Sequence, residues 1–121
     1  MNVPQYRKLI VWQKAHKNAL LIINLLNNCS QKYSKIIDQC LGAATSIGAN
    51  IAEGNSASSI RHKESYFTIA LNSSYEFDNW LQIFKDAKII SNSEPLLGIE
   101  KENIEVIKIL SKIVLTLKTD L

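Results

Sequence analysis

One segment of this chain, from Ile60 to Ile90, contains neither glycine nor proline and repeats apolar residues in steps of three and four. At about 1.5 Å per residue, a helix over this segment spans roughly 45 Å. Most of the aromatic mass available for a core lies in it, at Tyr66, Phe67, Phe77, Trp80 and Phe84. We therefore expect a fold built on long helices.

Three further segments show the same helical period between breaks in the pattern. They cover about residues 8–27, 33–53 and 99–118, and the longest helix covers 60–90. Ser91 to Pro95 is expected to separate the last two helices, the fourth beginning at about Leu96 or Ile99. Short connections favour antiparallel neighbours. The sequence predicts an all-α protein, an antiparallel up-down-up-down four-helix bundle that forms a single domain over residues 1–121.

The second predicted helix is rich in small side chains: Gly42, Ala43, Ala44, Ser46, Gly48, Ala49 and Ala52. Another backbone can approach the helix closely wherever these residues face a neighbour. That contact must offset the cost of glycine in a helix, about 1 kcal/mol each. Gly54 is predicted to cap the C-terminal end of this helix.

The first and fourth helices carry wider apolar stripes than one core contact requires. The few polar residues of the first helix are Lys14, Lys17, Asn18 and Asn24. In the fourth helix, one narrow line faces solvent, formed by Lys101, Glu105, Lys108, Lys112 and Thr116. Because apolar surface left exposed in this way usually marks an interface, the pattern predicts a homo-oligomer.

The charge of the chain is distributed unevenly. Its net charge is +3, but residues 1–40 hold six basic and one acidic residue, a balance of +5, while residues 41–121 hold eight and ten, a balance of −2. Five copies of a +3 chain would carry +15, enough to attract phosphates. The candidate nucleic-acid-binding residues are Arg7, Lys8, Lys14, Lys17, Lys32, Lys35, Arg61 and Lys63. The alternative interpretation is a solvated face that keeps the protein soluble.

Several polar residues occur where the helices are otherwise small or apolar. Ser46, Asn50 and Glu53 share one face of the second helix, since they are spaced four and three residues apart. Buried polar groups need hydrogen-bond partners, so we interpret them as part of a structural network between helices. The alternative makes Glu53 an acid, a base or a ligand, paired with Glu76 around a metal. The residues assigned to the structural network are Gln13, Ser46, Asn50, Glu53 and Glu76.

The residue patterns that metal or covalent chemistry requires are missing from the sequence. His16 and His62 have no Glu three positions before them, which di-iron bundles need. Cys29 and Cys40 have no second pair of zinc ligands and are expected to be free thiols. A Gly-rich phosphate loop and a G-x-S-x-G elbow are also missing. We therefore expect no catalytic residue, no metal and no cofactor, and a protein that is not an enzyme.

The N-terminal residues MNVPQYRK do not show the basic-then-apolar order of a signal peptide. No segment approaches the roughly 18 uninterrupted apolar residues of a membrane span. The expected location is the cytoplasm, without membrane attachment.

Three motifs carry a family resemblance: Val11 to His16 reads VWQKAH, Ala44 to Gly54 reads ATSIGANIAEG, and Ile69 to Ser73 reads IALNS, with Glu76 three residues later. In order and separation they resemble the bacterial four-helix bundle proteins associated with 23S ribosomal RNA intervening sequences. The resemblance covers about residues 7–118, and SIGANIAEG is its most specific part. It implies a small cytoplasmic bundle that assembles as a ring-like homopentamer, in a family whose members mostly lack an assigned activity.

A related branch, the accessory variability determinants of diversity-generating retroelements, resembles this fold. The resemblance implies a positively charged pentameric barrel that binds nucleic acid, RNA or DNA, and a reverse transcriptase as protein partner. This chain departs from the pattern, because Leu41 and Gly42 stand where many relatives carry an Arg pair, and Asn55 to Ala57 stand where another Arg follows. Arg61 and Lys63 lie slightly later and are the candidates to compensate.

Two classes of function therefore stay open. The first is a non-enzymatic oligomeric accessory module that binds nucleic acid or a ribonucleoprotein through repeated basic faces. The alternative is a structural or protein-interaction scaffold without nucleic-acid affinity.

Overall fold

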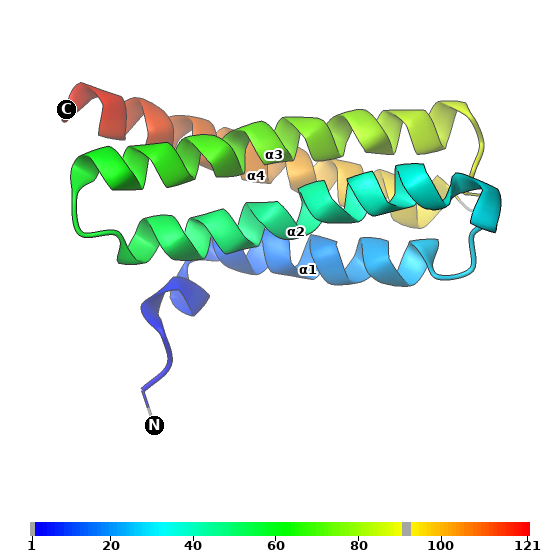
Figure 1. The fold of residues 1–121 in the computed structure, drawn as a ribbon, viewed down its shortest axis with the longest axis horizontal. Coiled ribbons are helices and arrows are strands. Elements are labelled where there is room, and N and C mark those ends of the chain that lie inside the picture. The colour runs from blue at the N-terminus through cyan, green and yellow to red at the C-terminus, as the bar shows by residue number, and fades with distance from the viewer. Residues whose placement is uncertain (1, 91–92) are drawn as a thin grey trace.

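The computed structural model describes residues 2–90 and 93–121. They form the helices α1 (Ile10–Leu26), α2 (Ser34–Ser56), α3 (Ile60–Asp86) and α4 (Ser93–Thr119), and the short 3-10 helices η1 (Gln5–Lys8) and η2 (Gln31–Tyr33). Consecutive α-helices run antiparallel (Figure 1). The described residues contain no β-strand. The prediction of an all-α, up-down-up-down four-helix bundle is confirmed.

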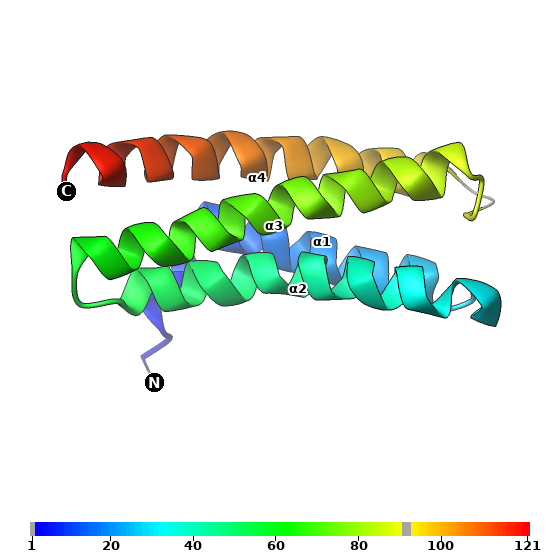
Figure 2. The ribbon, with the colours of Figure 1, turned by 45° about the horizontal axis from the view of Figure 1, so that its top comes forward.

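The four helices form a square in which each packs against two neighbours. Both α1 and α3 contact α2 and α4, whereas the described residues make no α1–α3 or α2–α4 interface. Figure 2 shows α4 and α2 on opposite sides of the bundle. The bundle therefore has four outer faces, each between two adjacent helices, and the α1–α2 face lies opposite the α3–α4 face.

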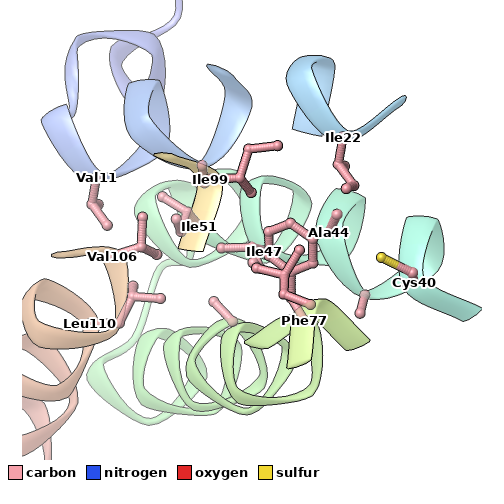
Figure 3. Packing of buried hydrophobic residues seen from close by; sticks show 14 of the residues in the cluster. Val11, Ile22, Cys40, Ala44, Ile47, Ile51, Phe77, Ile99, Val106 and Leu110 are labelled. Atoms are coloured by element: carbon pink, nitrogen blue, oxygen red, sulfur yellow. The ribbon is translucent and has the colours of Figure 1, made fainter. Parts of the chain in front are cut away.

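All four helices contribute to one hydrophobic core. Ile22 of α1, Ile47 and Ile51 of α2, Phe77 of α3 and Leu110 of α4 point toward a common centre (Figure 3). Ile47 and Ile51 share a helix face because they are four residues apart. All of them are buried, so the apolar period that predicts the helices also marks the side that faces the core.

Helix α2 continues to Ser56, beyond the predicted end at residue 53, and Gly54 is not its C-cap. Gly54 lies within the helix, and no glycine of the described chain has a positive φ. What requires glycine is space, because a Cβ at Gly54 would lie 2.8 Å from Cε2 of Phe67 and 3.2 Å from Cβ of Tyr66. The glycine lets α3 approach α2, and Ala57 is the extended residue that ends the helix.

Helix α3 ends at Asp86, four residues before the predicted end at residue 90. Lys88 has a left-handed φ of 55°. The backbone N–H of Ile89 donates to the carbonyl of Phe84 at 3.1 Å, and that of Lys88 donates to the carbonyl of Lys85 at 3.3 Å. This pair of bonds is a Schellman motif, which usually has glycine at the left-handed position. Lysine there, followed by two apolar residues, makes the sequence look helical for one turn too long.

Helix α4 begins at Ser93, before the predicted start at Leu96 or Ile99. Pro95 therefore lies in the first turn of α4 instead of in the connection. Proline fits there because the first N–H groups of a helix have no partner within the helix. Residues 91 and 92, which belong to the predicted separator, lie outside the described residues.

Candidate functional site

Basic side chains occupy both ends of the bundle instead of one continuous face. Arg7 and Lys8 lie in η1, directly before α1, and Arg61 lies in the first turn of α3. In Figure 1, η1 lies toward the end of the bundle where α2 connects to α3. All three side chains are exposed. We call Arg7, Lys8 and Arg61 the proximal basic end.

Lys32 and Lys35 lie at the opposite end, where α1 connects to α2 (Figure 1). Both are exposed, and Lys32 Nζ lies 5.1 Å from the centroid of the Tyr33 ring. We call these two lysines the distal basic end. Because α1 has 17 residues, about 25 Å separate the two ends. Lys17, also exposed, lies between them on α1.

Two of the candidate lysines are engaged within the chain. Lys14 Nζ lies 2.5 Å from Glu102 Oε1 of α4, and this hydrogen bond raises the pKa of Lys14. Lys63 Nζ donates to the backbone carbonyls of Gly54 and Asn55 at 3.2 and 2.9 Å. These carbonyls belong to the last turn of α2, which needs outside donors. Lys14 and Lys63 therefore join elements of the bundle, which leaves the other candidates freer to bind a ligand.

Ser46 is the centre of a polar cluster between α2 and α3. Asn50 Nδ2 donates to the carbonyl oxygen of Ser46 at 2.9 Å and to its Oγ at 3.0 Å. Ser73 Oγ of α3 donates to Ser46 Oγ at 3.0 Å. The sequence places Ser46 and Asn50 on one face, but it does not identify Ser73, whose contact depends on how the two helices pair.

The remaining residues assigned to the network make other contacts. Gln13 Nε2 donates to a backbone carbonyl of η1 at 2.8 Å. Glu76 lines the same groove as Ser46, but its Oε2 accepts from Trp80 Nε1 at 3.2 Å within α3. Glu53 is exposed, and its carboxylate makes no hydrogen bond or ion pair with the described residues. Gln13 and Glu53 therefore stand outside the Ser46 cluster, and Glu76 lies at its edge.

Two buried asparagines connect α4 to the rest of the bundle. Asn18 Nδ2 of α1 donates to the carbonyl of Ile99 at 2.9 Å, and Asn103 Nδ2 donates to the carbonyl of Ser74 at 2.9 Å. The amide oxygens of both asparagines are buried without a partner in the described chain. Asn18 follows buried Ala15 by three residues, so helical spacing alone places it in the core, although its polarity suggests a solvent-facing position.

A further polar contact between α3 and α4 is centred on Glu100. Its Oε2 accepts a very short hydrogen bond from Gln82 Nε2 and lies 3.3 Å from Lys85 Nζ. The hydrogen bond from Gln82 lowers the pKa of Glu100, and Lys85 acts in the same direction. Glu100 therefore stays ionised at neutral pH.

The two cysteines differ in their surroundings, although both are free. Burial raises the pKa of the Cys40 thiol to about 12, and the charge of Glu76 acts in the same direction. Since the thiolate is the reactive form, Cys40 is inert at neutral pH. Cys29 is partly exposed, just beyond the end of α1.

Neither a metal-binding cluster nor a membrane-spanning helix is found in the described residues. Three or more His, Cys, Asp or Glu side chains do not come together anywhere in this part of the chain. None of its helices combines the length and the apolar character needed to cross a bilayer.

Comparison with known proteins finds a matching family model and similar solved structures. A family model described as 23S rRNA-intervening sequence protein matches residues 7–112. A crystal structure of a protein with unknown function from the S23 ribosomal protein family of Bacteroides thetaiotaomicron VPI-5482 is 31% identical, with a TM-score of 0.78. The similarity covers 87% of this chain and 98% of that chain. A search of functionally curated proteins finds no match.

Proposed function

Because the chain belongs to the 23S rRNA-intervening sequence protein family, we propose that it is a non-enzymatic accessory module that binds nucleic acid or a ribonucleoprotein as a homo-oligomer. The pentamer that the resemblance implies is the assembly we expect. The family itself has no established activity, so the case for binding depends on the surface of this chain.

The observation that carries the proposal is the state of the basic side chains. Six of the eight candidates are exposed and make no ion pair with the described residues: Arg7, Lys8, Lys17, Lys32, Lys35 and Arg61. A cation that is not neutralised by its own chain can replace the counterions of a phosphate backbone. Only the other two candidates make contacts within the described chain: Lys14 forms an ion pair, and Lys63 donates to backbone carbonyls.

The arrangement of these cations supports binding to phosphates without recognition of bases. The proximal and distal basic ends lie on short 3-10 helices and on the first turns of α2 and α3, and not along one helix face of the kind that reads bases in a major groove. Subunits assembled side by side would repeat each basic end around one rim of the oligomer. Phosphate contacts repeated in this way add affinity but no sequence preference.

A mobility-shift titration with structured RNA, single-stranded DNA and duplex DNA at two salt concentrations tests the proposal. We expect retardation below about 1 μM protein at low salt, and a steep loss of affinity as salt rises. Replacing Lys32 and Lys35 by Gln should weaken binding. The slope of log K against log salt concentration should also become less steep, by roughly 0.7–0.9 for each phosphate that is no longer neutralised. The triple replacement of Arg7, Lys8 and Arg61 by Gln tests the other end.

Lys101→Gln with Lys112→Gln is the matched control, since both lysines are exposed on α4, make no ion pair with the described residues and lie outside both basic ends. It should change binding much less than the distal double variant. Equal losses would mean that only net charge matters. If the wild type shows no retardation at low salt, the nucleic-acid proposal fails and the scaffold alternative stands. Light scattering on the same samples measures the oligomer mass separately.

A further inference from the structure

A pocket of about 510 Å³ lies between α1 and α4, and we call it the α1–α4 pocket. It is formed by the second half of α1 and the first turns of α4, so it lies toward the distal basic end (Figure 1). Leu21, Leu25, Pro95 and Ile99 give it apolar walls. Sites for small molecules are mostly apolar cavities of about 300–1,000 Å³ in which a few polar groups orient the ligand. The α1–α4 pocket has the size and the walls of such a site.

Asn18 supplies this pocket with a hydrogen-bond acceptor that has no partner. Asn18 lines the pocket, although the residue is only 2% exposed. Its Nδ2 donates to the carbonyl of Ile99 at 2.9 Å, and because a carbonyl can only accept, the amide nitrogen has to face α4. The amide oxygen is then left buried with no partner in the described chain. A buried acceptor lowers stability unless a donor reaches it, so a ligand can make here a hydrogen bond that the chain does not.

Gly98 provides open space on the α4 side of the pocket. A Cβ at this position would meet nothing within 4 Å, apart from its chain neighbours and the backbone of its own helix turn. At Gly54, by contrast, the Phe67 ring fills the corresponding space. Nothing in the described chain uses the space beside Gly98, and it is therefore available to a bound molecule.

The charges that line the pocket favour an anionic group. Glu102 is one of them, but Lys14 Nζ lies 2.5 Å from its Oε1 and neutralises it. Lys17 also lines the pocket, is exposed, and makes no ion pair with the described residues. An anion on a ligand would be attracted to this ammonium group at the rim.

We propose that the α1–α4 pocket binds a small amphipathic molecule with an apolar body, a hydroxyl or N–H donor for Asn18 Oδ1, and an anionic group for Lys17. A ring or short chain would occupy the space between Leu21, Leu25 and Gly98. The contact between α1 and α4 is the smallest between neighbouring helices, so a slight separation of these two disturbs the least packing when the molecule enters. This inference goes beyond the proposed function, since it requires neither nucleic acid nor a second copy.

Indole-3-propionate and its 1-methyl derivative are matched probes, because only the first has an N–H donor. Ligand-detected saturation-transfer NMR measures weak binding to the whole protein, whatever its oligomeric state. We expect a Kd of about 1 mM or below for indole-3-propionate, in line with the affinity that small ligands gain per atom. The methylated probe should bind about 3–10-fold more weakly, because it makes no hydrogen bond to Asn18. A third probe, 3-methylindole, lacks the carboxylate and should bind about 2–5-fold more weakly.

Two glycine variants test whether the probe occupies this pocket. Gly98→Leu places a side chain in the open space and should weaken binding of indole-3-propionate at least about 10-fold. Gly42→Leu is the matched control, since Gly42 also has nothing within 4 Å of a Cβ but lines the groove that holds Ser46. It should bind the probe like the wild type. Asn18→Leu removes the acceptor and should bring indole-3-propionate and its 1-methyl derivative to equal affinity.

The proposal is overturned if the wild type binds no probe at several millimolar, or if Gly42→Leu weakens binding as much as Gly98→Leu. Equal affinity of the wild type for the two matched probes overturns it as well, because the Asn18 oxygen would then contribute nothing to binding. This comparison uses the wild type alone, so it decides the question even where a variant fails to fold. No nucleic acid is present in these samples, and the result is independent of the mobility shift.

Discussion

Helices α2 and α3 approach each other closely at a glycine, whereas α4 adds buried polar contacts to its share of the hydrophobic core. Between α2 and α3, Gly54 lets the Phe67 ring lie against the helix backbone, and this pair has the most extensive contact in the bundle. Around α4, Asn18 and Asn103 donate to backbone carbonyls across helix interfaces, and each leaves a buried oxygen unpaired. The contact between α1 and α4 is the smallest between neighbouring helices.

The difference shows two ways of holding helices in register. Steric packing tolerates little change in side-chain volume, because interiors are packed as densely as crystals. Polar contacts tolerate changes in shape better but not the loss of a partner or the addition of a charge. Substitutions in the two regions should therefore lower the free energy of unfolding for different reasons. The following variants measure that difference.

The largest effect is expected where α4 meets α1. Asn18→Asp places a carboxylate in a buried position, where it faces the carbonyl of Ile99 in place of the amide N–H that donates to it. A buried uncompensated charge costs about 3–5 kcal/mol, so the free energy of unfolding should fall by that order at neutral pH. Burial raises the pKa of such a carboxyl in the folded state, so the loss should shrink as pH falls toward the unfolded pKa.

Urea unfolding from neutral to acid pH measures the effect of Asn18→Asp. Asn24→Asp on the same helix is the control, because Asn24 is exposed, and it should leave stability nearly unchanged. Equal losses in the two variants would show that the position of Asn18 at the α1–α4 contact is not what matters.

Gly54→Ala tests the close packing between α2 and α3. The new methyl group would lie 2.8 Å from the Phe67 ring, so the ring or the helix must move. Overpacking typically costs about 1–3 kcal/mol, partly offset by the better helix propensity of alanine, so we expect a net loss of about 1–2 kcal/mol. Gly42→Ala, in the same helix, meets nothing within 4 Å and should gain up to about 1 kcal/mol. A loss in both variants would contradict the steric explanation.

Lys88→Gly tests the turn that leads from α3 to α4. Lys88 adopts a left-handed φ of 55°, which costs a residue with a side chain about 1 kcal/mol or more. Glycine removes that cost but gains freedom in the unfolded chain, so a stabilisation of about 0.5–1 kcal/mol is expected. Thermal unfolding should show a higher Tm. Ala87→Gly, next to it but with a right-handed φ of −83°, should lower the Tm instead.

The sequence predicts features that depend on one helix and misses features that depend on how two helices pair. Apolar spacing predicts all four helices and the Ser46–Asn50 face, because these depend on neighbours along one helix. It misses the role of Gly54 and the Ser46–Ser73 hydrogen bond, because both depend on the register between two helices. Lys63 likewise appears as a free cation in the sequence, and only the fold brings its ammonium to the end of α2.

The smallest effect is expected at the edge of the α3–α4 contact. The hydrogen bond from Gln82, with help from Lys85, lowers the pKa of Glu100 in the folded state below its unfolded value. The stabilisation is therefore present above the unfolded pKa and is lost as pH falls through the folded pKa. Glu100→Gln should cost less than about 1 kcal/mol at neutral pH, since the site is near the surface.

Urea unfolding near neutral pH and at about pH 3 measures this difference, which should shrink as the wild-type carboxylate becomes protonated. Glu105→Gln is the control, because its contact with Lys108 is 3.8 Å long and exposed, and it should have no measurable effect at either pH. A gap between Glu100→Gln and the wild type that is unchanged at acid pH would assign the role of Glu100 to packing. In that case α4 would be held at this point in the way that α2 is held to α3.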